Sequence, residues 1–395
     1  MTSDTPSKTT PSESDRHEPS RVVTGRHEPH RVELDPAESV SPDDQSAAPP
    51  ERAPQVRVDH PDIAEGINEL IAKVGGAPDS FDGRLVREML TAGLKLIPDG
   101  RGTGDLKLMT AAVKELRYAY RVFAEYPEPH KCTIFGSART PEDHPDYLVT
   151  VELGKLMAQR GWMVITGAGD GIMKAGHEGA EREKSFGVAI RLPFETTAND
   201  VIAGDNKLIH FRYFFTRKLM FLSQAEAVVL CPGGFGTLDE AYETLTLIQT
   251  GKASMIPIVL LEGEAGYWDE WIRFTEDVLL KRGLISPEDL DFYYFAKTPA
   301  EAADHIEGFY RNYHSSRYVR DDLIIRLKKP LKDEDVERLG DEFSSLVKTG
   351  RMHQRAAYDV EEDHLHLPRL CFTHTRYAYG RVRQLIEAIN ACDPV

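Results

Sequence analysis

The stretch CPGGFGTLDE, residues 231–240, decides how this chain folds, because it joins an apolar strand to a helix through a glycine-rich loop. The apolar run at 227–231 predicts a buried strand, and a helix is predicted over 238–250. Three glycines allow the loop to turn sharply and to approach a ligand closely. They are Gly233, Gly234 and Gly236. Thr237 can donate its hydroxyl and cap the helix, whose first N–H groups favour an anion such as phosphate. The stretch therefore predicts phosphate binding, with a purely structural glycine turn as the alternative.

On both sides of this stretch the chain repeats one order: strand, glycine turn, helix. Short runs that are apolar along their whole length predict strands buried on both faces. These runs lie at 132–135, 163–166, 186–192, 227–231 and 256–261. Helices are predicted between them, at 147–160, 172–184, 216–223 and 238–250. Such alternation is typical of an α/β protein with a Rossmann-like, doubly wound parallel sheet.

Composition divides the chain into four parts. Residues 1–56 are rich in Ser, Thr, Pro and charged side chains, so we expect a disordered tail. Helical spacing of apolar residues predicts a helical lead-in over 57–127. The domain with the alternating pattern covers 128–317, and a small α+β appendage follows at 318–395. The predicted elements of the appendage are strands at 322–327 and 367–373 and helices at 332–347 and 379–390.

Charge and cysteine content exclude several classes of protein. The chain of 395 residues carries 64 acidic and 48 basic side chains, a net charge of −16, which argues against general nucleic-acid binding. The four cysteines are scattered without CxxC spacing, so neither a zinc site nor a disulfide framework is expected. No apolar run approaches the length of a membrane span, and the first residues are polar. We therefore expect a cytoplasmic protein without membrane partners.

A second glycine loop, GAGDG at 167–171, also follows a predicted strand and opens a helix. Alone it is a weak match to a dinucleotide fingerprint. The next predicted strand ends at Arg191, and no acidic residue stands where a ribose-binding carboxylate is expected. The pattern therefore favours a mononucleotide over NAD.

A third signal is the pair Arg217 and Lys218, at the start of the helix that precedes the strand at 227–231. Paired basic residues on a helix usually form a solvated face. Here the preceding residues are strongly apolar, so the segment is expected to be partly buried. A cation held in such a place needs an anionic partner.

The order of four motifs resembles that of the Lonely Guy (LOG) family of nucleotide phosphoribohydrolases. The motifs are FGSAR at 135–139, TGAGDGIM at 166–173, TRKLMF at 216–221 and PGGFGTLDE at 232–240. The resemblance covers about 131–265 and implies a Rossmann-like fold. It also implies cleavage of nucleoside 5′-monophosphates to a free base and ribose 5-phosphate. The extensions on both sides resemble those of longer bacterial members.

The resemblance also assigns roles to individual residues. It implies that Arg217 and Glu240 are catalytic and that 233–237 form the phosphate loop. The expected substrate-binding residues are Gly136, Ser137, Arg139, Gly167, Gly169, Gly171, Asn199, Lys218, Gly233, Gly234, Gly236, Thr237 and Thr246. Asn199 stands nearest to a position that is acidic in compact members, so sugar or base recognition is expected to differ. The resemblance implies no metal and no cofactor.

The residue types fit hydrolysis of an N-glycosidic bond, because breaking a ribose C1′–N bond develops oxocarbenium character on the sugar. The Glu240 carboxylate could stabilise that charge and orient or deprotonate a water molecule. Arg217 could hold the phosphate or support the charges around Glu240. AMP or a cytokinin riboside monophosphate is the expected purine substrate. The alternative is a nucleotide-binding or pterin-cofactor-binding protein without hydrolysis. No residue marks the pyridoxal phosphate lysine of a lysine decarboxylase.

The helix at 238–250 carries an apolar stripe, which is the usual pattern of a core-facing helix. The stripe consists of Leu238, Tyr242, Leu245 and Ile248. The family resemblance adds that members dimerise at this helix. We therefore expect a homodimer or higher homo-oligomer, with a small-molecule nucleotide as the other partner.

Overall fold

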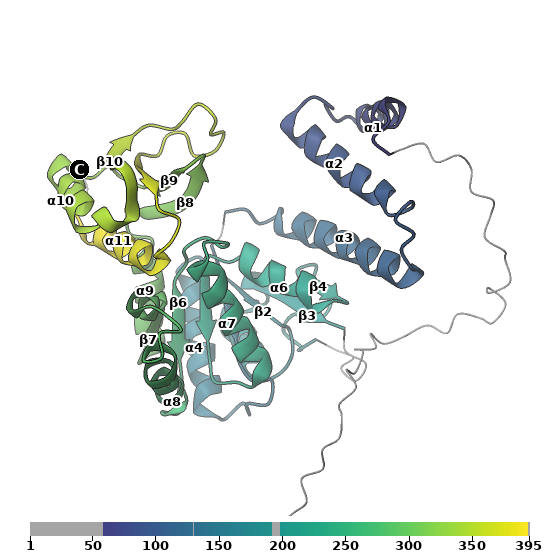
Figure 1. Ribbon diagram of the computed structural model, residues 1–395. Coiled ribbons are helices and arrows are strands. Elements are labelled where there is room, and N and C mark those ends of the chain that lie inside the picture. The colour runs from purple at the N-terminus through teal and green to yellow at the C-terminus, as the bar shows by residue number, and fades with distance from the viewer. Residues whose placement is uncertain (1–57, 129, 192–197, 394–395) are drawn as a thin grey trace, which may run out of the picture. The chain divides into compact units, whose positions relative to one another are not determined.

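The computed structural model describes residues 58–128, 130–191 and 198–393. The predicted disordered tail at 1–56 lies outside these residues. The chain forms two compact units, Met1–Asp99 and Gly100–Val395 (Figure 1). Among the described residues, no helix has the length and apolar character that a membrane span requires.

The described part of the first unit contains two helices, α1 (Pro61–Lys73) and α2 (Phe81–Lys95). The Ser80 hydroxyl caps α2 by accepting a hydrogen bond from the Gly83 N–H at 3.0 Å. Arg87 of α2 donates a hydrogen bond to Asn68 of α1 at 3.2 Å, which ties the two helices together.

The second unit is built on a seven-stranded sheet in the order β4-β3-β2-β1-β5-β6-β7. Every neighbouring pair is parallel, which confirms the predicted doubly wound fold. The strands are β1 (Lys131–Phe135), β2 (Met163–Thr166), β3 (Ser185–Ile190), β4 (Leu208–Phe211), β5 (Ala227–Leu230), β6 (Ile258–Leu261) and β7 (Tyr293–Ala296). The central strands β1, β2, β5 and β6 are buried along their whole length, as expected for strands covered on both faces.

Strand β1 lies at the centre of the sheet, and the order of strands reverses beside it. Cys132 of β1 pairs with Val164 of β2 on one side and with Ala227 of β5 on the other. The chain first builds the sheet outward through β2, β3 and β4, and then returns to build the other half from β5. In open α/β sheets such a reversal leaves a crevice at the carboxyl ends of the strands, where ligands bind.

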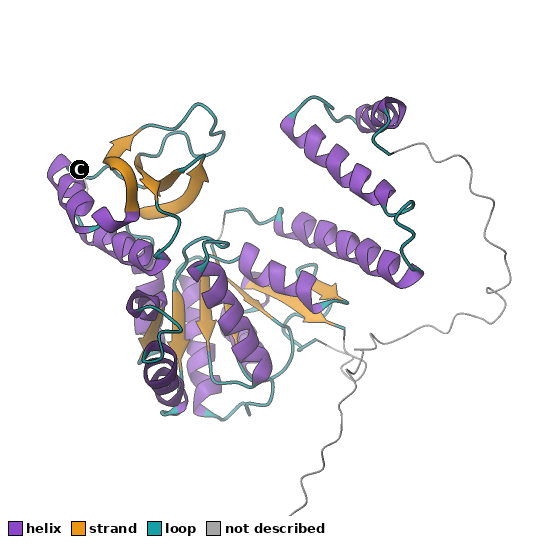
Figure 2. Cartoon of the chain, in the orientation of Figure 1, coloured by secondary structure: helices purple, strands orange, loops and turns teal. Residues whose placement is uncertain are grey.

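Helices cover both faces of the sheet (Figure 2). They are α4 (Pro145–Gln159), α5 (Ile172–Ala180), α6 (Phe214–Ser223), α7 (Phe235–Gln249), α8 (Tyr267–Phe274) with a π-helical continuation (Thr275–Leu280), and α9 (Pro299–Phe309). Helix α4 packs beside α5 and α9, whereas α6 and α7 lie on the opposite face (Figure 1). Helices α6 and α7 are therefore neighbours on one face of the sheet, and an ion pair from Lys218 to Asp239 joins them.

Helix α3 (Thr103–Phe123) is part of the second unit. Its last turns bury Ala119, Val122 and Phe123 in the main core. The Phe123 ring stacks on Phe186 of β3, with ring centroids 4.5 Å apart. The boundary between compact units therefore falls after Asp99, whereas composition placed the end of the lead-in at 127.

The C-terminal appendage forms an antiparallel sheet in the order β10-β11-β9-β8. Its elements are β8 (Tyr313–Val319), β9 (Asp322–Leu327), α10 (Asp333–Glu342), β10 (Val347–Arg355), β11 (Arg369–His374) and α11 (Tyr379–Ala391). The sequence analysis did not predict β8 and β10, because β8 is largely polar and β10 carries irregularities that break the alternation of buried and exposed residues. The predicted helix at 332–347 ends earlier, at Glu342.

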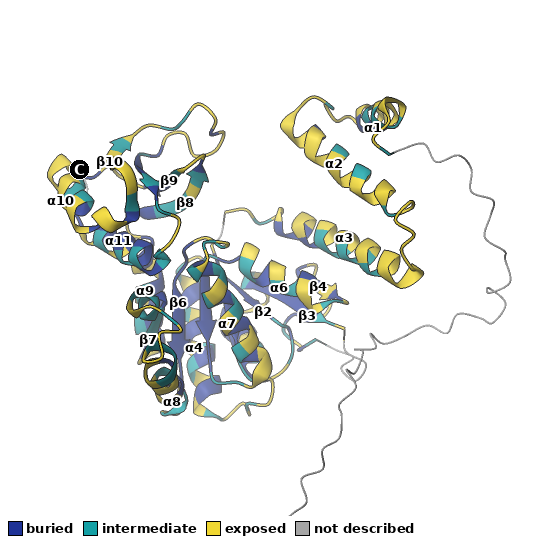
Figure 3. Ribbon diagram, in the orientation of Figure 1, coloured by how far each residue is buried: buried dark blue, intermediate teal, exposed yellow. Residues whose placement is uncertain are grey.

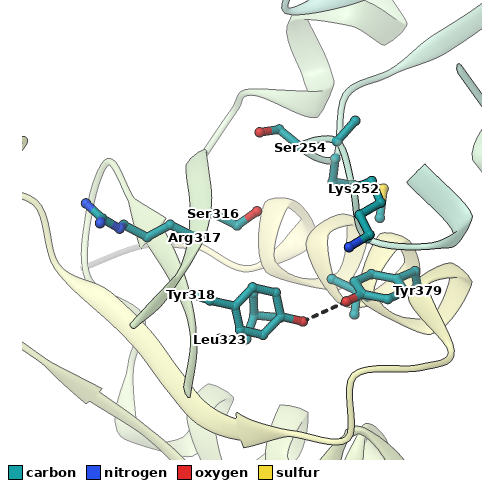
Figure 4. Close-up of a pocket in the computed structure, with 11 residues that line it drawn as sticks. Lys252, Ser254, Ser316, Arg317, Tyr318, Leu323 and Tyr379 are labelled. Carbon is teal, nitrogen blue, oxygen red and sulfur yellow. Dashed lines mark hydrogen bonds between the residues drawn. The ribbon is translucent and has the colours of Figure 1, made fainter. Parts of the chain in front are cut away.

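A small cavity of about 200 Å³ marks the seam between the appendage and the end of α7 (Figure 4). Tyr379 of α11 lies directly over Gly251, the residue after the C-cap of α7. The hydroxyls of Tyr318 and Tyr379 lie 3.0 Å apart, so β8 and α11 meet at this point. Gly251 adopts a φ of +66°, which a side chain rarely accepts.

The seam yields a stability prediction. In Gly251→Ala, the added Cβ would lie 2.1 Å from the Tyr379 ring, in a backbone conformation that itself disfavours a side chain. We expect a loss of about 1 kcal/mol from the backbone and about 1 to 3 kcal/mol more from overpacking. Gly204→Ala is the matched control, because Gly204 has a φ of +74° and its nearest neighbour would lie 3.9 Å away. The urea unfolding midpoints of the two variants measure their losses of stability. Equal losses of stability would show that contact with the Tyr379 ring adds nothing to the backbone effect.

Candidate functional site

Three loops meet at the carboxyl edge of the sheet, where the strand order reverses. They are 136–139 after β1, 167–171 after β2 and 231–234 after β5. The Ser137 N–H donates a hydrogen bond to the Pro232 carbonyl at 3.0 Å. The Ile172 N–H donates to the Ser137 carbonyl, also at 3.0 Å. The two predicted glycine loops are therefore joined through the FGSAR motif by hydrogen bonds.

Two of the predicted glycines are required by this close approach. A Cβ at Gly233 would lie 2.1 Å from the Thr237 hydroxyl oxygen. A Cβ at Gly171, whose φ is +59°, would lie 2.3 Å from the Ser137 carbonyl oxygen. Backbone and side chain occupy the space that any larger residue needs, so these positions hold the loops together rather than leave room for a ligand.

The start of α7 differs from the prediction. The helix begins at Phe235 and not at 238, with Gly234 as its N-cap. Thr237 is therefore not the capping residue: it lies in the first turn, and its N–H donates to the Gly234 carbonyl at 3.1 Å. Among residues 58–128, 130–191 and 198–393, no side chain caps this helix, and a Cβ at Gly234 or Gly236 would meet no atom within 4 Å. The N-terminus of α7 is thus open to solvent, as an anion site at a helix end requires.

Glu240 lies at the centre of the site, on the buried side of α7. The residue is 7% exposed, and Oε2 accepts no hydrogen bond from the residues that the structure describes. Burial raises the pKa of Glu240 to about 7. The positive charges of Lys218 and Arg217 partly offset the effect of burial on this pKa, and the neighbouring carboxylates of Glu243 and Asp239 add to it. A carboxyl group with a pKa near neutrality is suited to proton transfer at neutral pH.

Arg217 of the neighbouring helix α6 lies close enough to Glu240 for its charge to act on that carboxyl group. Its Nε donates a hydrogen bond to the Val188 carbonyl of β3 at 2.9 Å. The guanidinium carbon lies 5.0 Å from the centroid of the Phe221 ring, a cation–π distance. A Cβ at Gly167 would lie 2.5 Å from Nη2, so the guanidinium rests against the backbone of the second loop.

Lys218 connects α6 to α7. Its ammonium group lies 2.9 Å from Asp239 and 3.5 Å from Glu240, and it also forms a close ion pair with Glu243. The anionic partner expected for the basic pair is therefore supplied by three carboxylates of α7. Because the lysine is occupied by these groups, its predicted contact with substrate stays a prediction.

Asn199 is buried and holds the second loop in place. Its Nδ2 donates to the Gly169 carbonyl at 3.0 Å and lies 3.2 Å from Nδ1 of His177. His177 was not singled out from the sequence, where it is one histidine on the apolar face of α5. Its Nε2 lies 2.9 Å from the Phe186 carbonyl, which can only accept, so Nε2 carries the proton and Nδ1 accepts from Asn199. Burial lowers the pKa of His177, which keeps the ring neutral.

Two of the predicted residues have exposed side chains. Thr246 is exposed on α7, about 120° around the helix from Glu240 and about 9 Å along it. Arg139 has an exposed side chain, and its backbone N–H donates to the Ser137 hydroxyl at 3.0 Å. Tyr267, which the sequence analysis missed, donates its hydroxyl to the Gly233 carbonyl at 2.6 Å. In the part of the chain that the structure describes, no group of His, Cys, Asp and Glu side chains could hold a metal ion.

Comparison with known proteins identifies similar chains. Residues 168–306 match the model of the family described as "Possible lysine decarboxylase". The cytokinin riboside 5′-monophosphate phosphoribohydrolase LOG of Oryza sativa subsp. japonica is 28% identical over 188 residues, which cover 46% of this chain and 74% of that protein. An uncharacterized protein of Archaeoglobus fulgidus is 30% identical over 127 residues, 31% of this chain and 78% of that protein. The molybdenum cofactor carrier protein of Chlamydomonas reinhardtii is 23% identical, with a TM-score of 0.33 over 46% of this chain and 97% of that one.

The charge balance at Glu240 yields a prediction. Lys218→Met keeps the length of the side chain and removes the ammonium group that stabilises the Glu240 carboxylate. We therefore expect the pKa of Glu240 to rise above its value of about 7. The pH dependence of the carboxyl ¹³C chemical shift, assigned with Glu240→Gln, measures this pKa. Lys174→Met is the control, because Lys174 pairs with a different set of carboxylates, at Glu142, Glu178 and Asp200. An unchanged or lower pKa in Lys218→Met would contradict the assignment.

Proposed function

We propose, since this chain belongs to the Lonely Guy (LOG) family, that it hydrolyses the N-glycosidic bond of a purine nucleoside 5′-monophosphate. The products are the free base and ribose 5-phosphate, and AMP or a cytokinin riboside monophosphate is the substrate. One observation carries the proposal: a buried glutamate, whose pKa burial raises to about 7, lies in the second turn of a helix with an open, uncapped N-terminus. A protein that only binds nucleotides gains nothing from a buried carboxylate close to a phosphate.

The phosphate of the substrate is proposed to lie at the N-terminus of α7. The first turn of the helix offers N–H groups and the positive end of the helix dipole, both of which favour an anion. Gly234 and Gly236 are exposed and leave space for a phosphate to approach the backbone. Glu240 follows within the same helix, so a nucleotide bound by its phosphate brings the ribose toward the carboxylate.

In the proposed reaction the C1′–N bond breaks and its electron pair leaves with the base. The oxygen of a water molecule forms a bond with C1′, and the Glu240 carboxylate accepts the proton that the water loses. The departing base takes up one proton from solvent. The negative charge of Glu240 also stabilises the positive charge that develops on the sugar.

Arg217 is proposed to keep Glu240 ready for this role. A buried carboxyl group without neighbouring cations would stay protonated at neutral pH and could not accept a proton. The charges of Arg217 and Lys218 lower the pKa of Glu240 toward 7, so that a substantial fraction is ionised. Asn199 is proposed to act on the sugar or base through the 167–171 loop, because its own amide is bonded to Gly169 and His177.

The site is proposed to belong to a homo-oligomer. Helix α6 exposes Phe214, Phe215 and Leu219, which are 54%, 52% and 45% accessible, and Phe235 at the start of α7 is 94% accessible. Large apolar side chains exposed on neighbouring helices favour an interaction surface there. Light scattering of the purified protein measures the mass; a monomer would contradict this part of the proposal.

The proposed function is tested with a panel of nucleotides. The purified chain is incubated with AMP, GMP, CMP and UMP, and the free base and ribose 5-phosphate are quantified. We expect release of base from AMP at the highest rate. Tight binding of nucleotide without any release of base would overturn hydrolysis and favour a nucleotide-binding protein.

Replacing Glu240 by glutamine should lower the activity but raise the stability of the folded protein above neutral pH. Glu240→Gln should lower kcat at least about 100-fold, because a general base contributes that much, while nucleotide binding persists. The pKa of Glu240 rises from 4.5 to about 7 on folding, so the native state loses stability as the pH rises through this interval. At pH 8 the glutamine variant should therefore be more stable by about 3 kcal/mol, and at pH 4 it should match the wild type. Calorimetry at both pH values tests this; a less stable variant at pH 8 would show that burial does not penalise the carboxylate.

A further inference from the structure

A carboxylate in the middle of α3, Glu115, contacts the segment that begins α6. Its Oε1 accepts a hydrogen bond from the Arg212 N–H at 2.9 Å, and its Oε2 accepts one from the Thr216 hydroxyl at 2.7 Å. Arg212 lies two residues before α6 and Thr216 lies in its first turn, both about one hundred residues away in the sequence. Glu115 lies outside residues 168–306, the part that matches the family model.

The start of α6 has no capping group of its own. Its N-cap residue, Tyr213, makes no side-chain hydrogen bond to the helix, and the first turn contains no acidic residue. Helix N-termini are stabilised by a negative charge and by acceptors near the first N–H groups. Glu115 supplies the negative charge from a different helix, and it accepts hydrogen bonds from the Arg212 N–H just before the N-cap residue and from the Thr216 hydroxyl in the first turn. The C-terminal turns of α3 are packed against the core, since Phe123 stacks on Phe186 of β3 and Ala119 and Val122 are buried.

Thr216 connects this contact to the site. It is fully buried, and it precedes Arg217 directly in the first turn of α6. Arg217 is held at its far end by the Val188 carbonyl and by the Phe221 ring. The backbone from which its side chain extends depends on the first turn of α6, and that turn is tied to α3 by Glu115.

We infer that Glu115 is a positioning residue for Arg217 and that α3 is therefore part of the active-site framework. This inference rests on the proposed function, in which Arg217 sets the charge balance at Glu240. Displacements of about 1 Å at a catalytic group can cost up to about 100-fold in rate. Loss of the Glu115 contacts loosens one turn and leaves the other anchors of Arg217 intact, so a smaller loss, of about tenfold in kcat, is expected.

The test compares variants at both ends of the contact in the full chain, with AMP as substrate. Glu115→Ala removes both hydrogen bonds and should lower kcat about tenfold with little change in KM. Glu115→Gln can still accept from Arg212 and can donate to the Thr216 hydroxyl, so it should recover most of the activity. Thr216→Val removes the hydroxyl without changing the shape of the side chain and should lower kcat, whereas Thr216→Ser should not. Glu125→Ala, on the exposed segment just after α3, is the matched control and should behave as wild type.

A second readout separates positioning from a general loss of stability. When Arg217 moves away, its charge stabilises the Glu240 carboxylate less, so the midpoint of the pH–rate profile of Glu115→Ala should shift upward. The loss in Glu115→Ala should also disappear in an Arg217→Met background, because both changes act on one group. A lower melting temperature with an unchanged kcat and an unchanged profile would overturn the inference. So would additive losses in the double variant. If the wild type releases no base from any nucleotide, the proposed function fails first, and that outcome is distinct from both.

Discussion

The reversal of strand order between β1 and β5 is the constraint on which the rest of this protein depends. Because the two strands are neighbours, the loops that follow them are joined by the hydrogen bond from Ser137 to Pro232, and the N-terminus of α7 opens beside that joint. The same geometry places Glu240 on the buried side of α7, opposite the basic pair of α6. Lys218 and Arg217 stabilise the ionised form of Glu240 at this buried position. The charge balance of the site therefore depends on how the fold places α6 beside α7.

The features that could be predicted from the sequence are local or strongly periodic. Apolar runs predicted the central strands, glycine loops predicted the edge at which the site lies, and the basic pair predicted an anionic partner, which α7 supplies. The four motifs also led to the family, and the comparisons agree with that assignment. Each run, loop or motif consists of residues that are close in the sequence, so it can be recognised without knowledge of the fold.

The features that could not be predicted depend on contacts between distant parts of the chain. Glu115 and Thr216 are about one hundred residues apart, and neither is unusual in its own helix. His177 is important because Asn199 and Phe186 surround it, not because of its neighbours in sequence. The start of α7 was placed three residues late, since glycines at a helix N-terminus look like a loop until the backbone is seen. Strands β8 and β10 lack alternation because only part of each faces the core.

In the proposed reaction the Glu240 carboxylate accepts the proton of the attacking water. Burial raises the pKa of Glu240, and the two neighbouring cations limit the rise to a value of about 7. The most direct measurement is the pH dependence of kcat/KM for the wild-type chain with AMP, from about pH 5 to about pH 9. We expect kcat/KM to rise with pH through an apparent pKa near 7 and then to level off. A profile that is flat across this range, or that falls as the pH rises through 7, would contradict it.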